Sequence, residues 1–292
     1  MGCVRRSAAF AFICASFAFP GANAQGLAIV DDAGRKVELK APAQRIVTLA
    51  PFLTELAYSA GAGGKLVGAS AHSDYPAEAK KLPQVASAAG PDIESLAALA
   101  PDLVLAWQDS IRPAEVERIG KLGIAVFVAR AKRLDDPPRL AEAIARLAGT
   151  DASAGIRAYR ERLQLAVSAH AARTRIRLFV EVWHRPLTTI GGTHWINEAL
   201  GACGAENVFA DLGAVAPVVS WEELYRRDPR AVLVAGPAAG EAESRANWRE
   251  RASIPAIKAR RFAYIDADTL TRPTLRLAEG VERVCAAVEK FR

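Results

Sequence analysis

The chain has 292 residues, 51% of them hydrophobic and 24% charged, which suits one or two globular domains and excludes a disordered chain. Its 38 basic and 32 acidic residues give a net charge of +6, an ordinary excess for a protein of this size. No basic run is interleaved with aromatic residues, so nucleic acid is not an expected partner, and charge alone identifies no other.

The first residues have the pattern of a secretory signal peptide. Two arginines precede an apolar run at residues 8–19, and an Ala-Asn-Ala triplet follows at residues 22–24. This order predicts a signal peptide of residues 1–24, whose removal lowers the net charge to +4 because it carries two arginines and no acids. The apolar run is shorter than the roughly 20 residues of a membrane span, which disfavours the alternative of an anchor. We therefore expect a periplasmic protein.

Two cysteines, Cys203 and Cys285, remain after that removal. In an oxidising compartment they are expected to form a disulfide between positions 82 residues apart, with two buried free thiols as the alternative. Chain-entropy arithmetic gives such a cross-link an upper value of about 4 to 5 kcal/mol. No CxxC metal or redox motif is present in the sequence.

The N-terminal half alternates strands with helices. A hairpin is predicted at residues 27–39, and a buried strand at residues 45–50 is stopped by Pro51. A helix starts at Thr54 and ends at Gly61. The alternation continues with strands at 66–69, 102–107 and 125–128 and helices at 93–99 and 113–121. Such alternation favours parallel βαβ units.

Residues 151–172 are predicted to form one long helix, because the segment is rich in Ala, Leu, Arg and Glu and contains no Pro. Thr150 or Asp151 can cap its first turn. Some 20 helical residues span roughly 30 Å, about the width of a small domain. The helix therefore separates an N-terminal lobe, residues 25–150, from a C-terminal lobe, residues 173–292.

The order of elements begins again after this helix. In two segments a Glu is followed by Leu after two residues and by Pro after seven, and a strand comes next: these segments start at Glu94 and at Glu222. A strand at residues 175–182 and a helix at residues 195–203 repeat the earlier order as well. The repetition predicts two Rossmann-like α/β lobes with mostly parallel sheets and a cleft between them; halves that share only a generic pattern are the alternative.

Catalytic motifs are absent from the sequence. The glycine-rich residues 61–68 lack the glycines of a dinucleotide fingerprint or a P-loop, and neither G-x-S-x-G nor H-E-x-x-H occurs. His72, His184 and His194 follow predicted strands and could bind a metal together with Glu181 or Asp268 on ligand type alone, but no H-x-H or H-x3-H spacing supports this. We expect no catalytic residue, no protein-held metal and no cofactor.

Five aromatic residues lie just after predicted strands or at the start of the following helix: Phe52, Tyr75, Trp107, Trp183 and Trp195. Open α/β sheets bind their ligands at this edge. A cleft lined by flat, rigid side chains suits a large, partly apolar, planar ligand.

Seven segments carry a family resemblance: RIVTLAPFLTELAYSAG (45–61), SAHSDYP (70–76), LAALAPDLVLAW (96–107), LGIAVF (122–127), ALGACGAENVF (199–209), VVSWEEL (218–224) and TRPTLRLAEGVERVC (271–285). With them the chain resembles the periplasmic substrate-binding proteins of ABC importers whose lobes are joined by a single rigid helix. Within that family the cobalamin binders are most similar, while heme and siderophore binders share the scaffold.

The resemblance implies ligand contacts at nine positions: Pro51, Phe52, Asp74, Tyr75, Trp107, Trp183, His184, Asp268 and Arg272. It also implies that Cys203 and Cys285 are paired. Ala216 and Thr269 stand where the cobalamin binders carry aromatic residues, and Trp195 is expected to fill part of that space.

Family members dock on their permease through one acidic residue on each lobe. The C-lobe position matches Glu222; on the N lobe the strict match is Pro113, so the nearby Glu115 is the expected substitute. Favourable placement in a helix first turn is the ordinary alternative explanation for such an acid.

The chain is therefore expected to be a monomeric, non-enzymatic receptor. It would capture cobalamin or a related corrinoid and deliver it to an ABC importer in the inner membrane, with little lobe closure because the linking helix resists bending. One alternative is a heme or iron-siderophore receptor in which Tyr75 or His184 is a ligand. Another is a chelatase-like α/β enzyme, for which the sequence offers no base or nucleophile with an oriented partner.

Overall fold

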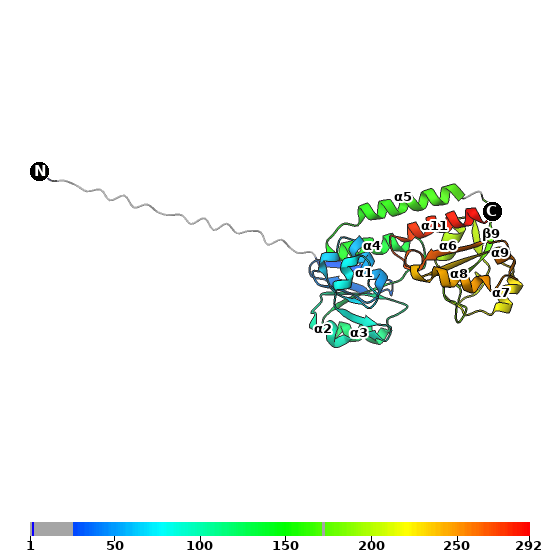
Figure 1. Ribbon diagram of the computed structural model, residues 1–292. Coiled ribbons are helices and arrows are strands. Elements are labelled where there is room, and N and C mark those ends of the chain that lie inside the picture. The colour runs from blue at the N-terminus through cyan, green and yellow to red at the C-terminus, as the bar shows by residue number, and fades with distance from the viewer. Residues whose placement is uncertain (1, 3–25, 171–172) are drawn as a thin grey trace.

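Two α/β lobes lie side by side beneath one long helix, α5 (Ser153–His170), in the computed structural model, which describes residues 2, 26–170 and 173–292 (Figure 1). The expected signal peptide, residues 1–24, lies outside these residues apart from Gly2, as do the last two residues of the helix expected at 151–172. No helix among the described residues combines the length and apolarity needed to cross a membrane.

The N lobe is built on a six-stranded sheet in the order β6-β5-β4-β3-β7-β8. Its strands are β3 (Ile46–Thr48), β4 (Leu66–Ser70), β5 (Gln84–Ser87), β6 (Gly90–Pro91), β7 (Leu103–Trp107) and β8 (Ala125–Ala129). All neighbours are parallel except β5 and β6. The predicted hairpin is present as β1 (Leu27–Val30) and β2 (Lys36–Leu39).

Helices cover the N-lobe sheet: α1 (Pro51–Ser59), α2 (Ile93–Ala98), α3 (Pro113–Gly120) and α4 (Asp136–Ala148), with 3-10 turns η1 (Gly63–Lys65) and η2 (Ala77–Lys81). The expected start of the first helix at Thr54 was late, since Pro51 occupies the first helical position, where its missing N–H costs nothing. Helix α4 was not predicted from the sequence. Pro137 and Pro138 lie in the first turn of α4 and are compatible with a helix for the same reason.

The C lobe contains a four-stranded parallel sheet in the order β10-β9-β11-β12. Its strands are β9 (Ile176–Glu181), β10 (Ala205–Asn207), β11 (Ala231–Gly236) and β12 (Phe262–Asp266). The corresponding N-lobe order is β4-β3-β7-β8, so the two sheets have the same topology. The repeated Glu-x-Leu segments form α2 and α7 (Trp221–Arg227), each leading through a Pro into a central strand. The predicted repeat of helix, Pro and strand is confirmed.

The remaining C-lobe helices are η3 (Ala238–Gly240), α6 (Ile196–Ala202), α8 (Glu241–Arg249), α9 (Pro255–Lys258), α10 (Ala267–Leu270) and α11 (Leu277–Lys290). The expected disulfide is present between Cys203, at the end of α6, and Cys285 of α11. Both cysteines are buried in the same apolar cluster.

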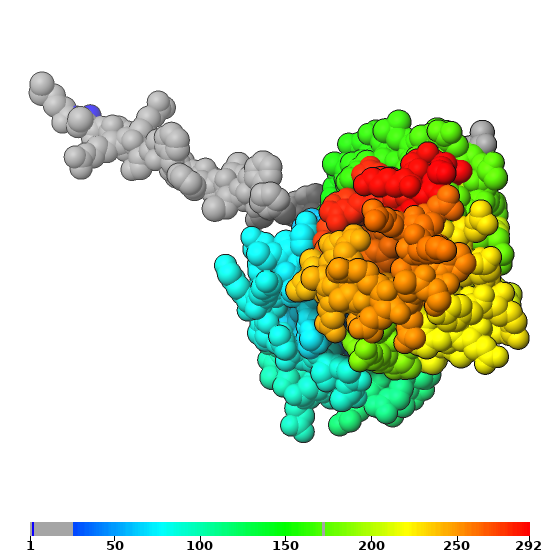
Figure 2. Space-filling view, turned by 45° about the vertical axis from the view of Figure 1, so that its right-hand side comes forward, coloured from blue at the N-terminus to red at the C-terminus, as the bar shows by residue number. Residues whose placement is uncertain are grey.

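The long helix α5 is fastened to both lobes. Asp151 accepts a hydrogen bond from the Ser153 N–H (2.9 Å), the first N–H of the helix, whereas the Thr150 hydroxyl donates to the Ala60 carbonyl (2.6 Å). The Tyr159 hydroxyl donates to the Leu134 carbonyl (2.6 Å), and Leu134, which precedes α4, packs in the C-lobe core. In the space-filling view, green α5 and red α11 lie along the same side of the molecule (Figure 2). Because Leu134 packs in the C-lobe core, the chain contacts that lobe once before α4 and again along α5.

A buried carboxylate joins the lobes directly. Glu55 of α1 is 1% exposed and accepts hydrogen bonds from the Thr274 hydroxyl (2.6 Å) and from Nε (2.7 Å) and Nη2 (2.6 Å) of Arg276. Thr274 and Arg276 belong to the segment between α10 and α11 of the C lobe. The N lobe thus contributes the charge and the C lobe contributes its donors.

Candidate functional site

A cavity of about 250 Å³ lies between the two lobes. Trp107, the last residue of β7, lines it from the N lobe, and Val182, the first residue after β9, lines it from the C lobe. The loop at residues 212–216 forms part of the cavity wall. Its close approach requires a glycine at position 191, because a Cβ on that residue would collide with the Ala214 carbonyl oxygen. This interlobe pocket lies at the carboxyl ends of the parallel strands, the usual ligand edge of an open α/β sheet.

Trp107 is the principal N-lobe aromatic residue of this pocket. The Phe52 ring meets it edge-on, with ring centroids 5.7 Å apart and planes at 87°. Phe52, which follows Pro51 at the start of α1, is 4% exposed. Its buried ring packs against the indole and restricts its orientation. Among the described residues, no hydrogen-bond partner reaches the buried Trp107 Nε1. That N–H is a donor which a ligand acceptor could satisfy.

Trp195 is largely part of the C-lobe core. It is 6% exposed, and its Nε1 donates to the Leu270 carbonyl (3.0 Å). Trp195 lines the interlobe pocket together with Ala216, as expected from the small side chain at position 216. Thr269 is buried, and its hydroxyl donates to the Asp266 carbonyl (2.9 Å). The contact that Trp195 can make with a ligand is therefore an edge rather than a broad ring face.

His194 packs against Trp195, with ring centroids 4.0 Å apart, and its Nδ1 accepts the Ile196 N–H (3.2 Å). Burial lowers the pKa of His194 to about 4. The imidazole is consequently neutral at physiological pH and contributes no charge to the pocket.

Three of the expected polar residues converge across the lobes. Arg272 of the C lobe lies between Asp74 of the N lobe (Nη1 to Oδ1, 2.8 Å) and Asp268 (Nη2 to Oδ1, 3.0 Å). Burial raises the pKa of Asp268 despite that neighbour. Burial also acts to raise the pKa of Asp74, but the hydrogen bond and charge of Arg272 prevail and hold it below the usual range. A ligand carboxamide or hydroxyl would meet a charged network here.

Tyr75 stands beside this network and is 45% exposed. The Arg276 guanidinium lies over its ring, 3.7 Å from the centroid, and is itself held by Glu55. Sequence reasoning missed Glu55 and Arg276. The available signal was a single charged residue within the otherwise uncharged run Phe52–Ala57, since a charge on a buried helix face requires a partner.

Trp183 and His184 belong to the loop after β9. Trp183 is 64% exposed, and its Nε1 donates to the Arg185 carbonyl (2.9 Å). His184 Nδ1 donates to Glu181 Oε2 (3.2 Å), and the Trp248 indole donates to the same oxygen (2.9 Å). Burial raises the pKa of Glu181 in spite of these bonds.

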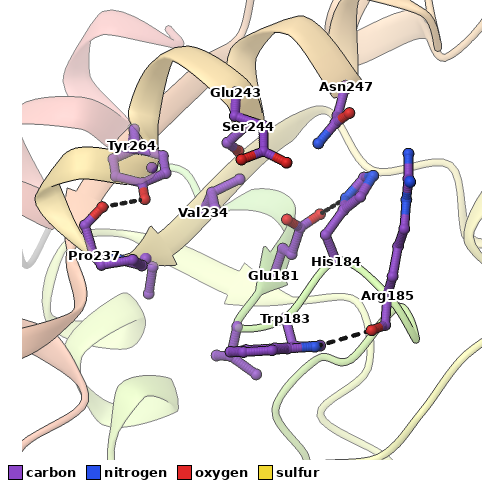
Figure 3. A pocket seen from close by; sticks show the side chains of 14 residues that line it. Glu181, Trp183, His184, Arg185, Val234, Pro237, Glu243, Ser244, Asn247 and Tyr264 are labelled. Carbon is purple, nitrogen blue, oxygen red and sulfur yellow. Dashed lines mark hydrogen bonds and ion pairs between the residues drawn. The ribbon is translucent and has the colours of Figure 1, made fainter.

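This loop borders a second cavity, of about 330 Å³, beneath α8 (Figure 3). Val182 lines both cavities, so the second pocket adjoins the interlobe pocket across the Trp183 loop. We call it the α8 pocket. Within the described part of the chain, no three His, Cys, Asp or Glu side chains are grouped to hold a metal ion.

The two expected docking acids differ in side-chain exposure and in hydrogen bonding. Glu222 is exposed in the first turn of α7, whose cap is Ser220. Glu115 of α3 accepts the Arg112 N–H (2.8 Å) and pairs with its guanidinium, so its side chain is only 12% exposed. That hydrogen bonding lowers the pKa of Glu115. Both helices lie on the side of the lobes away from α5 (Figure 1).

Comparison with known proteins places these features in context. A family model described as periplasmic binding protein matches residues 46–269. Vitamin B12-binding proteins of Vibrio cholerae and Vibrio vulnificus are each 34% identical, over 84% and 86% of this chain and 88% and 93% of their own. The crystal structure of periplasmic vitamin B12 binding protein BtuF of Vibrio cholerae has a TM-score of 0.79 at 32% identity, covering 86% of this chain and 98% of that chain.

A periplasmic heme-binding protein, RhuT from Roseiflexus, has a TM-score of 0.72 at 21% identity, covering 85% of this chain and 99% of that chain. At this identity the likeness extends to the fold alone. The fold is therefore shared by proteins whose printed names refer to different ligands.

The depressed pKa of His194 predicts a specific loss of stability in acid. The folded protein keeps this side chain neutral down to about pH 4, whereas the unfolded chain takes up its proton near pH 6.5, so acid favours unfolding in that window. Relative to His194→Asn, the wild-type free energy of unfolding should fall by up to about 3 kcal/mol between pH 6.5 and 4. Urea titrations at several pH values measure this difference; parallel stability curves for the two proteins would contradict it.

Proposed function

Since this chain belongs to the family of periplasmic binding proteins, we propose that it captures cobalamin, or a closely related corrinoid, between its lobes and delivers it to an ABC importer. The names of its relatives at 34% identity support the choice of ligand, and the match to the Vibrio cholerae structure supports the mode of binding. In this proposal the mature protein works in the periplasm as a monomer and catalyses no reaction.

The observation that carries the proposal is the convergence of aromatic and polar side chains at one edge of both lobes. Trp107 offers an indole backed by Phe52, and Trp183 and Tyr75 offer exposed rings. Flat rings suit the planar corrin macrocycle through dispersion and apolar burial.

The polar residues suit the periphery of such a ligand. Corrinoids carry carboxamide groups around the macrocycle, and these groups both donate and accept hydrogen bonds. Asp74, Asp268 and Arg272 form a network that contains carboxylate acceptors and guanidinium donors. His184, on the opposite side of the Trp183 loop, adds another polar group.

A heme or siderophore receptor would use Tyr75 or His184 as a ligand. The Arg276 guanidinium covers the ring face of Tyr75 and His184 Nδ1 donates to Glu181, so these contacts involve neither the Tyr75 hydroxyl nor His184 Nε2. Heme and ferric siderophores therefore enter the test as competing ligands.

Titration of the mature protein with cyanocobalamin should quench its tryptophan fluorescence at micromolar concentrations or below. Trp107 and Trp183 line the proposed site, so a stacked, light-absorbing macrocycle would affect both indoles. Heme and a ferric siderophore, titrated in parallel, should bind at least about tenfold more weakly, a difference of 1.4 kcal/mol. Tight heme binding together with no response to cyanocobalamin would overturn the proposal.

Docking on the permease is proposed to use Glu222, with Glu115 as the N-lobe counterpart. Glu222→Lys should abolish uptake in cells while leaving cyanocobalamin affinity unchanged, because this exposed side chain lies outside the ligand pockets. Glu250→Lys is the matched control, since Glu250 is also an exposed C-lobe acid outside both ligand pockets. Equal uptake by the Glu222 variant and the control would exclude Glu222 as a docking residue, and lost affinity would reassign it to ligand binding.

A further inference from the structure

The α8 pocket is a largely apolar cavity with a few polar groups, and it lies next to the interlobe pocket. Its floor is formed by the ends of β9 and β11, with Tyr264 of β12 at one side, and its roof is helix α8. Figure 3 shows the side chains of Glu243 and Asn247 pointing from that helix toward Glu181 and His184. A corrinoid is larger than either cavity alone, so a bound macrocycle would extend past Trp183 and reach this chamber.

Glu181 is the most constrained group in the pocket. The residue is 2% exposed, yet both of its hydrogen-bond donors, His184 and Trp248, bind the same oxygen, Oε2. Among the described residues no donor reaches Oε1, and this oxygen is open to the pocket rather than buried. It can therefore accept an N–H or O–H group from a ligand.

A second polar group lacks a partner on the opposite side. The Ser244 hydroxyl of α8 is buried, and no other described residue forms a hydrogen bond with it. Because a hydroxyl can donate as well as accept and can rotate between staggered positions, it can serve either end of a ligand group. The pocket thus offers one carboxyl oxygen, Glu181 Oε1, and one adaptable hydroxyl.

This combination selects among ligand groups. A carboxylate would be repelled by Glu181 and by Glu243, which also lines the pocket. The side chains of a corrinoid end in amides rather than ammonium groups, so the choice lies between an amide and its hydrolysed carboxylate. A neutral primary amide avoids the repulsion, because its N–H₂ can donate to Glu181 while its carbonyl accepts from Ser244.

We propose that the α8 pocket binds one peripheral primary amide of the ligand, with Glu181 as the residue that distinguishes this amide from a carboxylate. The inference rests on the proposed function, since it assigns one group of the corrinoid to a defined chamber. It adds a specificity-determining residue beyond the stacking aromatics and the Asp74–Arg272–Asp268 network.

The test uses cyanocobalamin and the series of its monocarboxylic acids, each with one side-chain amide hydrolysed, measured by isothermal titration. Wild-type protein should bind one member of the series at least about tenfold more weakly than cyanocobalamin, because its carboxylate would face Glu181. Glu181→Gln should remove most of that difference, since a carboxamide side chain can donate to the ligand carboxylate. Glu206→Gln, which changes an acid on β10 outside the pocket, is the matched control and should keep wild-type discrimination.

Ser244→Ala provides a second variant that leaves Glu181 intact. It should weaken the binding of cyanocobalamin about fivefold. The affinity for the monocarboxylic acid that wild type binds weakly should stay unchanged, because the hydrolysed group of that acid no longer occupies the pocket. If every acid binds wild type within about twofold of cyanocobalamin, or if Glu181→Gln folds and retains full discrimination, the amide assignment is overturned while the proposed function stands. Failure of wild type to bind cyanocobalamin at all would overturn both.

Discussion

The arrangement of the two lobes depends on one buried carboxylate. Glu55 is 1% exposed, and its three hydrogen bonds all come from Thr274 and Arg276 of the C lobe. Removing Arg276 would leave the Glu55 charge buried and unpaired, which costs about 3 to 5 kcal/mol. The same guanidinium lies over Tyr75, so the bond that fixes the lobes also fixes a wall of the proposed site.

Recognition follows from this fixed geometry. Helix α5 packs against α11 and α4 and spans both lobes, so hinge bending would have to break its contacts as well as the bond at Glu55. The interlobe pocket and the α8 pocket lie on either side of the Trp183 loop and share Val182. A ligand would therefore meet preformed surfaces, and its selectivity would depend on which of its groups fit each pocket.

Local patterns in the sequence were sufficient for the strand and helix alternation, the long helix and the repeated helix, Pro and strand, because each depends on neighbouring residues. The disulfide followed from counting cysteines. Contacts between distant segments were beyond such reasoning: Glu55 meets Arg276 across 221 positions, and Trp195 is buried by contact with Leu270. The pairing of Glu115 with Arg112 is local and could have been anticipated as a capping interaction.

Because Glu55 and helix α5 hold the lobes in one orientation, the cleft should be formed before the ligand arrives. Small-angle X-ray scattering of the mature protein, with and without saturating cyanocobalamin, measures this most directly. We expect the same radius of gyration in both states within error. A clear contraction on binding would contradict a preformed cleft, since it would require the Glu55–Arg276 ion pair to break or helix α5 to bend.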